Sequence, residues 1–332
     1  MPEKPEGISI VICAKNESIH LKENLPLILE QDYPEFEVIV VNDCSMDDSA
    51  DYLYAMAARY PKLQIRDIKQ GSKLIQGKKY PLTVGIKAAV YDKVLLTDAD
   101  CSPVSNQWIK LMTASYKDKE IVLGYAPYQK KEGFLNKCIR FETFYSALQY
   151  LSYARAGVPY MGVGRNMSYK KKLFFDNNVF VKRTELFSGD DDLFINAVAR
   201  GRNTTIQLAK ESFMISEAKT TWEDWTNQKQ RHLSTARYYR ALHKFLLGLL
   251  PIAHMAFYAF VILTFVYSSF WQYALALILG RWLIEGVIFY PAMKRLNEKD
   301  IFLLFPLFDV LLFVYYIRFA SPALVNKTSK WK

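Results

Sequence analysis

FEVIVVND, residues 36–43, is a short run of mostly β-branched and apolar residues that ends on Asp43. ISIVICA, residues 8–14, has the same character. Apolar runs of this length, without alternating polar residues, are typical of strands that are buried on both faces. The two stretches therefore predict two strands of a buried parallel sheet.

The segments that follow alternate between helical and extended patterns. Leucines recur every four residues in 16–31, which predicts a helix. After the strand at 36–43 we expect a helix at 47–61, a strand at 63–69, a helix at 80–91 and a strand at 93–98. This order predicts an α/β fold with a Rossmann-like, mainly parallel sheet and right-handed crossovers. Ligands of such folds bind beyond the carboxyl ends of the strands, where Asn16, Asp43 and Asp98 fall.

Two carboxylates, Asp98 and Asp100, leave the predicted strand 93–98 in the stretch LLTDADC, residues 95–101. In an extended segment residues i and i+2 point to the same side, so we expect both side chains to face one spot. Mutual repulsion would favour protonation of one of them unless a cation is bound. Hard oxygen ligands suit Mg²⁺ or Mn²⁺, which keep positions open for substrate phosphates. The alternative is a solvated turn after a strand.

The composition limits the class of protein. The chain has 332 residues, of which 51% are hydrophobic and 15% aromatic, and its formal net charge is +10. Four cysteines without paired spacing predict a reducing compartment. The cations gather near the apolar segments late in the chain and follow no groove-binding motif, so we expect no nucleic acid partner.

The pattern changes from globular to membrane-like after about residue 240. Three apolar segments follow, at 245–270, 271–290 and 301–320, and the bilayer is therefore an expected partner. Arg281 and Glu285 lie four apart in the second segment and are expected to form a structural ion pair.

Basic residues before Phe245 and in the loop MKRLNEKD predict a multi-pass protein of the cell (inner) membrane by the positive-inside rule. Its domain 1–240 would be cytoplasmic, with the membrane region at 245–332. Two crossings satisfy the rule, and a third would send the lysines of NKTSKWK outside, against it. The third segment is therefore expected to re-enter the bilayer or lie in its interface, and a third crossing stays the alternative. Segments 134–157 and 222–244 are expected at the interface, the first to guide a lipid acceptor; packing against the sheet is the alternative for 134–157.

Three further polar stretches are candidates for chemistry. Lysines in GSKLIQGKKYPL could meet a diphosphate or simply be solvated; these are Lys73, Lys78 and Lys79. Three consecutive aspartates precede a predicted helix in GDDDLFINAV, residues 189–198. One or two would cap that helix, whereas three crowd together and raise the pKa of at least one, which suits a general base. WEDWTNQKQRH, residues 222–232, is either a juxtamembrane anchor or a lid over an anionic leaving group.

Taken in order, seven motifs resemble those of the inverting glycosyltransferases of family 2. They are KNE (15–17), VNDCSMDDS (41–49), GKKYPLTVGIKAA (77–89), TDAD (97–100), GVGRNMSYKK (162–171), GDDD (189–192) and QKQRH (228–232). Each motif is weak alone, and their shared order carries the resemblance, which covers residues 8 to about 240. The resemblance implies a GT-A fold, a nucleotide-sugar donor (a UDP-sugar above all) and a lipid-linked or growing saccharide acceptor.

The resemblance also implies roles for individual residues. Asp43 would bind the base, Asp98 the nucleotide, and Asp100 the metal and the donor diphosphate. Asp191, next to Asp190, would be the catalytic base, because the family's Gly-Asp-Asp form matches with Asn196 in step. Arg231 would stabilise the leaving group. Further donor-binding positions are Ala14, Asn16, Glu17, Lys78, Gln228 and His232, and the metal, Mg²⁺ or Mn²⁺, would be held by Asp100 with Asp98.

One position departs from the family pattern. His232 stands where membrane-bound synthases have a Trp after Gln-x-x-Arg, which weakens the case for a processive polymerase. Two alternatives remain at this point: a GT-A-fold nucleotidyltransferase and a catalytically inactive membrane scaffold. The first would lack the Gly-Asp-Asp-Asp and Gln-x-x-Arg elements, and the second would not need Asp100 and Asp191.

Overall fold

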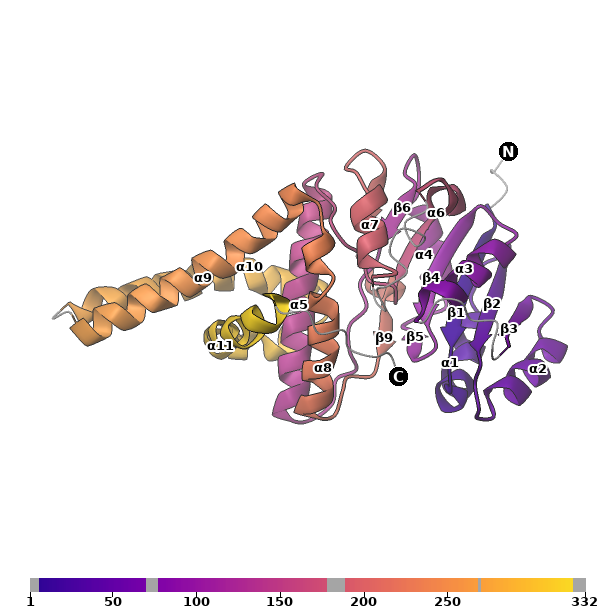
Figure 1. The fold of residues 1–332 in the computed structure, drawn as a ribbon, viewed down its shortest axis with the longest axis horizontal. Helices are drawn as coiled ribbons and strands as arrows, with labels where there is room; N and C mark the ends of the chain where they lie inside the picture. Colours follow the sequence, from indigo (N-terminus) through magenta and orange to yellow (C-terminus); the bar gives the residue numbers. More distant parts are fainter. Residues whose placement is uncertain (1–5, 70–76, 178–188, 268–269, 325–332) are drawn as a thin grey trace. The chain divides into compact units, whose positions relative to one another are not determined.

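The computed structural model describes residues 6–69, 77–177, 189–267 and 270–324, which divide into two compact units (Figure 1). Residues 6–129 and 146–218 form a sheet unit, and residues 130–145 and 219–324 form a helical unit. Lys73, one of the three candidate lysines, lies outside the described residues.

The sheet unit is built on a seven-stranded sheet of order β3-β2-β1-β4-β7-β6-β8. Strands β1 to β4 pair in parallel, whereas β7 runs antiparallel to β4 and β6, so the predicted mainly parallel sheet is confirmed. A separate antiparallel pair joins β5 and β9. The strands are β1 (Ile8–Ala14), β2 (Phe36–Asp43), β3 (Leu63–Ile68), β4 (Lys93–Asp98), β5 (Cys101–Pro103), β6 (Ile121–Leu123), β7 (Met167–Lys170), β8 (Thr204–Ile206) and β9 (Met214–Ser216).

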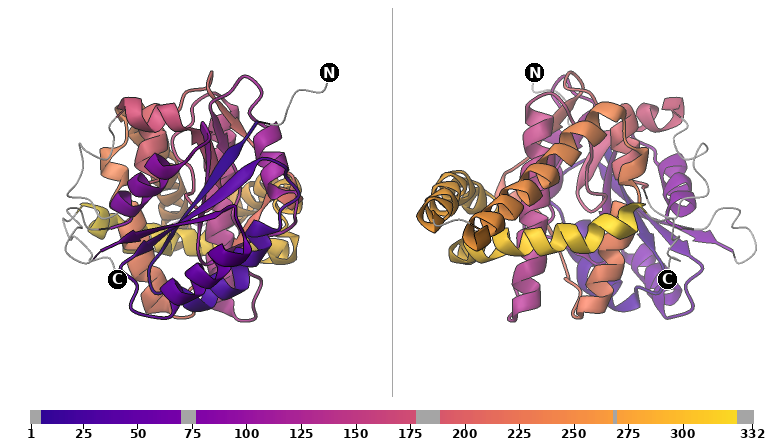
Figure 2. Two further views of the ribbon diagram at one scale, coloured as in Figure 1. Left: turned by 90° about the vertical axis from the view of Figure 1, so that its right-hand side faces the viewer. Right: turned by 60° about the vertical axis from the view of Figure 1, so that its left-hand side comes forward.

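Helices cover both faces of this twisted sheet (Figure 2, left). Alternate residues of β1 divide between two apolar cores: Ile10 and Ile12 pack with α1, α2 and α4, and Val11 packs with α3 and α7. The helices are α1 (Ser18–Leu29), α2 (Ser49–Arg59), α3 (Lys79–Ala88), α4 (Trp108–Ala114), α6 (Lys171–Asn177), α7 (Asp192–Val198) and, from residue 146 on, the end of α5 (Phe134–Arg155). The helices and strands expected between residues 8 and 98 are confirmed.

One local expectation is wrong. Asp98 ends β4, but Ala99 and Asp100 form a turn before β5, so the segment carrying the two carboxylates is not extended. Burial raises the pKa of Asp100, and Asp98 lies close enough for its negative charge to raise that pKa further. The turn therefore keeps the two carboxylates together by a route that simple alternation does not predict.

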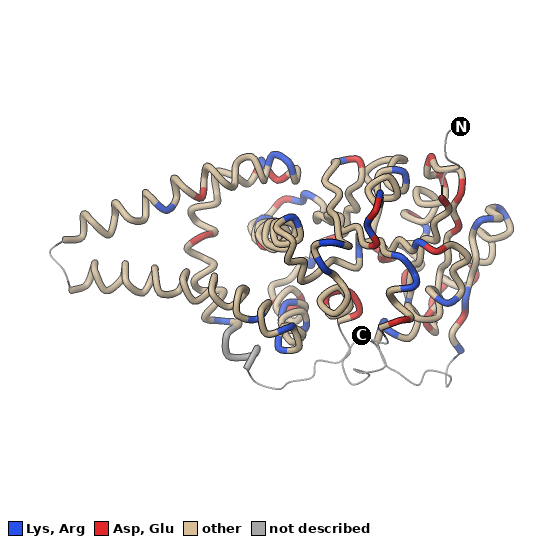
Figure 3. The backbone as a smooth tube through the Cα atoms, turned by 90° about the horizontal axis from the view of Figure 1, so that it is seen from above, with Lys and Arg blue, Asp and Glu red and all other residues tan. Residues whose placement is uncertain are grey.

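The helical unit contains the start of α5 together with α8 (Trp222–Leu233), α9 (Ala241–Tyr267), α10 (Trp271–Arg295) and α11 (Phe305–Leu324). A 3₁₀ helix, η4 (Lys299–Leu304), leads into α11. Among the described residues three helical stretches are long and apolar enough to cross a membrane: Ala241–Tyr267, Trp271–Arg295 and Lys299–Phe319. They overlap the three segments expected from the sequence. The tube of α9 and α10 carries few charges (Figure 3).

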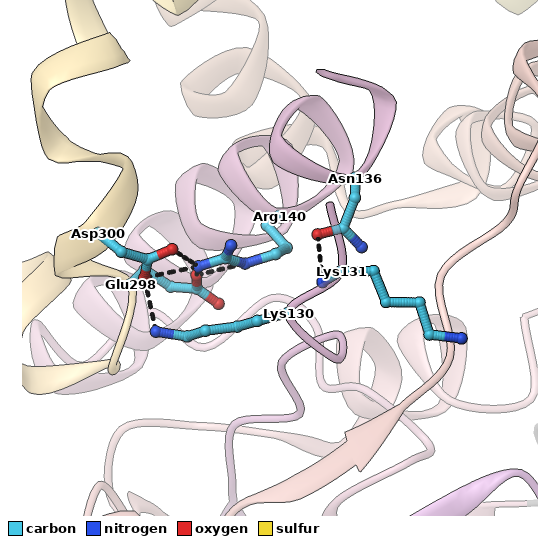
Figure 4. Close-up of polar contacts among 6 residues, drawn as sticks. All are labelled: Lys130, Lys131, Asn136, Arg140, Glu298 and Asp300. Atoms are coloured by element: carbon cyan, nitrogen blue, oxygen red, sulfur yellow. Dashed lines mark hydrogen bonds and ion pairs between the residues drawn. The ribbon is translucent and has the colours of Figure 1, made fainter. Parts of the chain in front are cut away.

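A buried ion pair joins α5 to the turn before η4 (Figure 4). Nε of Arg140 lies 2.9 Å from Oε2 of Glu298, and its terminal nitrogen lies 2.7 Å from Oδ2 of Asp300. Arg140 and Glu298 are 2% and 1% exposed, so neither charge is solvated and each depends on the other. Lys130 adds a 2.5 Å contact with Asp300.

A second cluster of charges lies among the apolar helices. Arg281 of α10 contacts Glu285 at 2.6 Å, as expected from their spacing, and it also donates to Asp309 of α11 at 2.9 and 3.1 Å. Asp309 further accepts hydrogen bonds from Tyr258 of α9 and Trp282 of α10. One buried carboxylate thus links three helices.

The aromatic residues of 134–157 are largely used in packing. Phe141 stacks on Phe308 with ring centroids 4.6 Å apart, and Phe144 packs edge-on against Phe289. The hydroxyl of Tyr150 donates to the carbonyl of Gly124. Burial thus accounts for these rings, and a part in guiding an acceptor stays a prediction.

Candidate active site

The loops after β1 and β2 meet beyond the carboxyl ends of these neighbouring strands. Asn16 and Cys44 both adopt left-handed backbone conformations, with φ of 55° and 56°, where each chain turns away from the sheet. Oδ1 of Asn16 accepts a 2.8 Å hydrogen bond from the N–H of Met46, and Ser45 accepts one from the N–H of Asn16. The two turns are therefore one interlocked structure.

Four predicted donor-binding residues lie in or beside these turns. Ala14 and Asp43 are buried at the ends of β1 and β2, and Asp43 is 1% exposed. Asn16 belongs to the interlocked turns, and Glu17 follows it and contacts His20 at 2.5 Å. Burial raises the pKa of Glu17, although the hydrogen bond from His20 opposes this. These four predicted residues are brought together at one edge of the sheet.

Lys78 connects two acidic segments that are more than 90 residues apart in sequence. Its ammonium forms an ion pair with Asp98 and lies 3.7 Å from Oδ2 of Asp190. Burial acts to lower the pKa of Lys78, but the carboxylates of Asp98 and Asp190 outweigh burial and raise it well above the ordinary value. The lysine is therefore a fixed positive charge between the end of β4 and the start of α7.

Asp100 lies in a different electrostatic setting from Asp98. Burial and the neighbouring Asp98 raise the pKa of Asp100, whereas the positive charge of Arg165 acts to lower it. The guanidinium of Arg165 lies 4.4 Å from the ring centroid of Tyr128 and bonds to the hydroxyl of Ser216. Arg165 is thus a positioned cation beside the aspartate pair.

The three aspartates before α7 have different environments. Asp190 faces Lys78. Asp191 caps the helix: its Oδ1 accepts from the N–H of Asp192 at 2.8 Å, and its Oδ2 accepts from the N–H of Gly164 at 2.9 Å. Burial, followed by the charges of Asp190 and Asp192, raises the pKa of Asp191 to about 7. A carboxyl group with that pKa is suited to accept a proton near neutral pH.

Position 164 needs a glycine because the backbone there lies close to Asp191. A Cβ at this position would lie 3.3 Å from Cβ of Asp191, closer than ordinary van der Waals contact. The motif GVGRN therefore supplies two features of the site: a backbone donor to Asp191 at Gly164 and a cation near Asp100 at Arg165.

The remaining predicted residues lie in the helical unit. Gln228, Arg231 and His232 are on α8, which begins where Thr221 accepts a 3.1 Å hydrogen bond from the N–H of Asp224. His232 is exposed, whereas Gln228 and Arg231 are partly buried. Their approach to the residues of the sheet unit stays a prediction.

Two residues of the site were not predicted from the sequence. Arg165 stands inside the motif GVGRNMSYKK, but nothing in that motif assigned it a role. Cys13 lies within β1, and its pKa is raised to about 12 by burial, with the charges of Lys78, Asp98 and Asp190 acting on it. A buried strand thiol carries no sequence signal for such a position.

The donor set fits Mg²⁺ or Mn²⁺ when the substrate supplies further ligands. Asp98 and Asp100 offer carboxylate oxygens at the end of β4. In the part of the chain that the structure describes, no group of three or more His, Cys, Asp or Glu side chains is arranged to hold a metal. Mg²⁺ is commonly held by one or two carboxylates with phosphate oxygens and water, which matches this set.

Sequence comparison identifies the family. Residues 9–175 match the sequence model of Glycosyl transferase family 2, and residues 93–289 match that of Glycosyl transferase family group 2. The chain belongs to glycosyl transferase family 2. This is the family that the ordered motifs predicted.

Among curated proteins, this family 2 chain is similar to poly-β-1,6-N-acetyl-D-glucosamine synthases. It is 34% identical over 98 residues to that of Staphylococcus epidermidis, which covers 30% of the chain and 23% of the synthase. It is 33% identical over 95 residues to that of Staphylococcus aureus strain COL, which covers 29% and 22%. The similarity spans less than a quarter of the length of these relatives.

Solved structures confirm the GT-A fold. The mannosyltransferase PcManGT from Pyrobaculum calidifontis, in complex with GDP-Man and Mn²⁺, has a TM-score of 0.58 at 16% identity, over 95% of this chain and 88% of that one. Residues 1–349 of S. aureus TarS, in complex with UDP-GlcNAc, have a TM-score of 0.51 at 16% identity, over 96% and 90%. At these identities the likeness concerns the fold.

Proposed function

We propose that this glycosyltransferase inverts the anomeric centre of a nucleoside-diphosphate sugar and transfers the sugar to a lipid-linked or saccharide hydroxyl at a membrane. A UDP-sugar is the favoured donor, since the synthase relatives make an N-acetylglucosamine polymer and TarS binds UDP-GlcNAc. One observation carries the proposal: Lys78 joins Asp98 of the aspartate pair to Asp190 of the acidic loop. This contact supports a single site that contains both the residues proposed to bind the donor and the proposed base.

The donor would lie across the carboxyl ends of β1, β2 and β4. The turns at Asn16 and Cys44, with Asp43 beneath them, are suited to hold the nucleoside. Lys78 would then exchange carboxylate contacts for diphosphate oxygens, which bring their own negative charge to the same place.

Asp100, with Asp98, would hold Mg²⁺ or Mn²⁺ together with the donor diphosphate. The bound cation would supply charge stabilisation for the departing diphosphate. PcManGT, which shares the fold, is bound to GDP-Man and Mn²⁺. Arg165, whose charge already acts on Asp100, would orient that carboxylate.

The acceptor hydroxyl must lose a proton as its oxygen attacks the anomeric carbon. Asp191 would accept that proton, while the bond between the anomeric carbon and the diphosphate oxygen breaks on the opposite face. A single displacement of this kind inverts the centre. The hydrogen bond from Gly164 would keep the carboxylate oriented during the attack.

Arg231, with Gln228 and His232 of α8, would stabilise the negative charge of the leaving group. The exposed apolar helices α9 and α10 would hold the enzyme in the cell membrane. The catalytic unit and the basic residues before α9 would both be cytoplasmic. Protease cleavage of residues 8–240 in inverted vesicles, with protection in right-side-out vesicles, would support this orientation, and the reverse pattern would reject it.

A panel of nucleotide-sugars tests the proposed function directly. Purified full-length protein in lipid is incubated with each donor and Mn²⁺, and release of the nucleoside diphosphate is followed with and without a lipid-phosphate or oligosaccharide acceptor. Release that depends on one donor supports a glycosyltransferase of this mechanism. Release of pyrophosphate from nucleoside triphosphates, or no turnover with any donor, would contradict it.

A further inference from the structure

Helix α11 differs from α9 and α10 in how much of its surface exposes apolar side chains. Its exposed apolar side chains, with one from η4, form a single stripe at alternating spacings of four and three residues: Leu303, Leu307, Val310, Val314 and Ile317. By contrast, α9 and α10 expose apolar residues along most of their lengths. A narrow stripe is typical of a helix that contacts apolar surroundings along one side only.

The other sides of α11 are covered, in part by two charged helices. Trp225 of α8 packs against Tyr315 and Phe319 with ring centroids 6.2 and 6.4 Å apart. On α5, Phe141 and Phe134 stack on Phe308. Helices α5 and α8 therefore pack against α11 between its residues 308 and 319.

Helices α5 and α8 carry charged residues that are unfavourable in the hydrocarbon core of a bilayer. Lys229 of α8 pairs with Glu142 of α5, and α8 also carries Glu223, Asp224 and Arg231. A charged side chain at the centre of a bilayer is unfavourable even on insertion scales. If α11 crossed the bilayer, α8 and α5 would be carried into the membrane with it.

The contacts of α11 with α9 and α10 indicate a crossing rather than parallel packing. Its start, with η4, meets α10, where Phe305 packs on Phe289 and Phe302 on Tyr290. Two to three turns after Phe305 it meets α9, where Phe313 packs on Tyr258 and Tyr316 on His254. The helix thus passes from one arm of the α9–α10 hairpin to the other, and Figure 2 (right) shows it running across these arms.

The geometry points to a membrane-surface role for α11: residues 299–319 lie in the plane of the interface, and of the described chain only the arms α9 and α10 enter the hydrocarbon core beneath it. The stripe from Leu303 to Ile317 then faces the acyl chains, and α5 and α8 lie on the aqueous side. Exposed Lys299 and Arg318 flank the stripe at headgroup level. This placement depends on packing alone and holds whichever sugar the enzyme transfers.

Spin labels on the stripe measure its depth. Single cysteines replace Leu303, Val310 or Ile317 in a full-length chain in which Cys13, Cys44, Cys101 and Cys138 are Ala. The matched control series on α9, with the same separations, is Ile252, Ala259 and Val266, all exposed. Depth is read in liposomes from collisions with oxygen and with a water-soluble nickel chelate.

An interfacial α11 places all three labels at one depth, roughly 5–10 Å below the headgroups. Along α9 each label of the control series should instead differ in depth from the next by about 10 Å, given the helix's 1.5 Å rise per residue. A Val310 label that lies about 10 Å deeper than those at Leu303 and Ile317 would overturn the proposal.

A second measurement needs no cysteine replacement. An epitope tag is fused after Lys332, and sealed vesicles containing the otherwise unchanged protein are treated with protease. The proposal predicts that the tag is removed only where residues 219–240 are also cleaved. Removal of the tag from vesicles that protect 219–240 would show that α11 crosses the bilayer.

Discussion

The backbone N–H of Gly164 donates a 2.9 Å hydrogen bond to Oδ2 of Asp191. The contact joins two segments 27 residues apart and leaves no room for a Cβ at position 164 without displacement of Asp191. Hydrogen bonds to a carboxylate lower its pKa, yet burial and two neighbouring aspartates hold the pKa of Asp191 at about 7. The site therefore presents a firmly oriented carboxylate that changes its protonation state near neutral pH.

The rate should follow that protonation state. A general base acts when ionised, so kcat should rise with pH through about 7 and level off above it. Steady-state kinetics from pH 5.5 to 9 at saturating donor would measure the profile. A kcat that is flat across this range would mean that Asp191 does not take the proton.

Lys78 should matter for donor binding more than its ordinary loop position suggests. Lys78→Met removes the charge between Asp98 and Asp190 and the expected contact with the diphosphate. A charge-assisted hydrogen bond contributes about 1.5–3 kcal/mol, so donor Kd should rise roughly tenfold to a hundredfold. Calorimetric titration with the donor or its nucleoside diphosphate measures this.

Lys87→Met is the matched control, because Lys87 is an exposed lysine at the other end of α3. It should leave donor Kd unchanged. If both substitutions raise donor Kd equally, Lys78 acts only through the overall surface charge and does not contact the donor.

Asp100→Asn should remove most turnover and raise the concentration of Mn²⁺ or Mg²⁺ needed for half-maximal rate. The substitution keeps the shape but removes one of the two carboxylates expected to share the cation with the donor. Titrations of rate against metal, at fixed donor, give the readout. Unchanged activity of wild-type and variant proteins in metal-free buffer would show that turnover does not need a metal.

The buried pair of Arg140 and Glu298 should hold the helical unit together. Arg140→Met removes the cation that pairs with the buried Glu298 carboxylate and should lower the free energy of unfolding by about 3–5 kcal/mol. Combining Arg140→Met with Glu298→Leu should recover most of that loss. Thermal unfolding in detergent compares them, with exposed Lys137→Met of α5 as the control. A double variant as unstable as the single one would show that packing volume, not charge, is what matters.

Much of the sheet unit was predictable because its signals are local. The strands at 8–14, 36–43 and 93–98 are continuous apolar runs, and their carboxyl ends fall at one edge by the rules of parallel sheets. The contact between Lys78 and Asp190 was not predictable, since it depends on where a loop and a helix start meet in space. The turn at Asp100 was only the alternative to an extended segment, because alternation in a strand says nothing about where that strand ends.

In the helical unit, prediction from the sequence was limited by contacts between helices. Apolar length predicted three candidate membrane segments correctly, and the spacing of Arg281 and Glu285 predicted their ion pair. The additional bond from Arg281 to Asp309 joins two helices and has no signal in either one. The covering of α11 by α8 likewise depends on tertiary packing of Trp225.

The assignment of Asp191 as the catalytic base is the central claim, and three variants test it most directly: Asp190→Asn, Asp191→Asn and Asp192→Asn. Asn caps a helix about as well as Asp, so capping alone would make all three nearly neutral. Kinetics and donor titration are measured for each. The account predicts that Asp191→Asn lowers kcat by about 10²–10⁴ with donor Kd nearly unchanged. Normal turnover of Asp191→Asn, or loss of turnover in Asp190→Asn alone with donor binding retained, would contradict it.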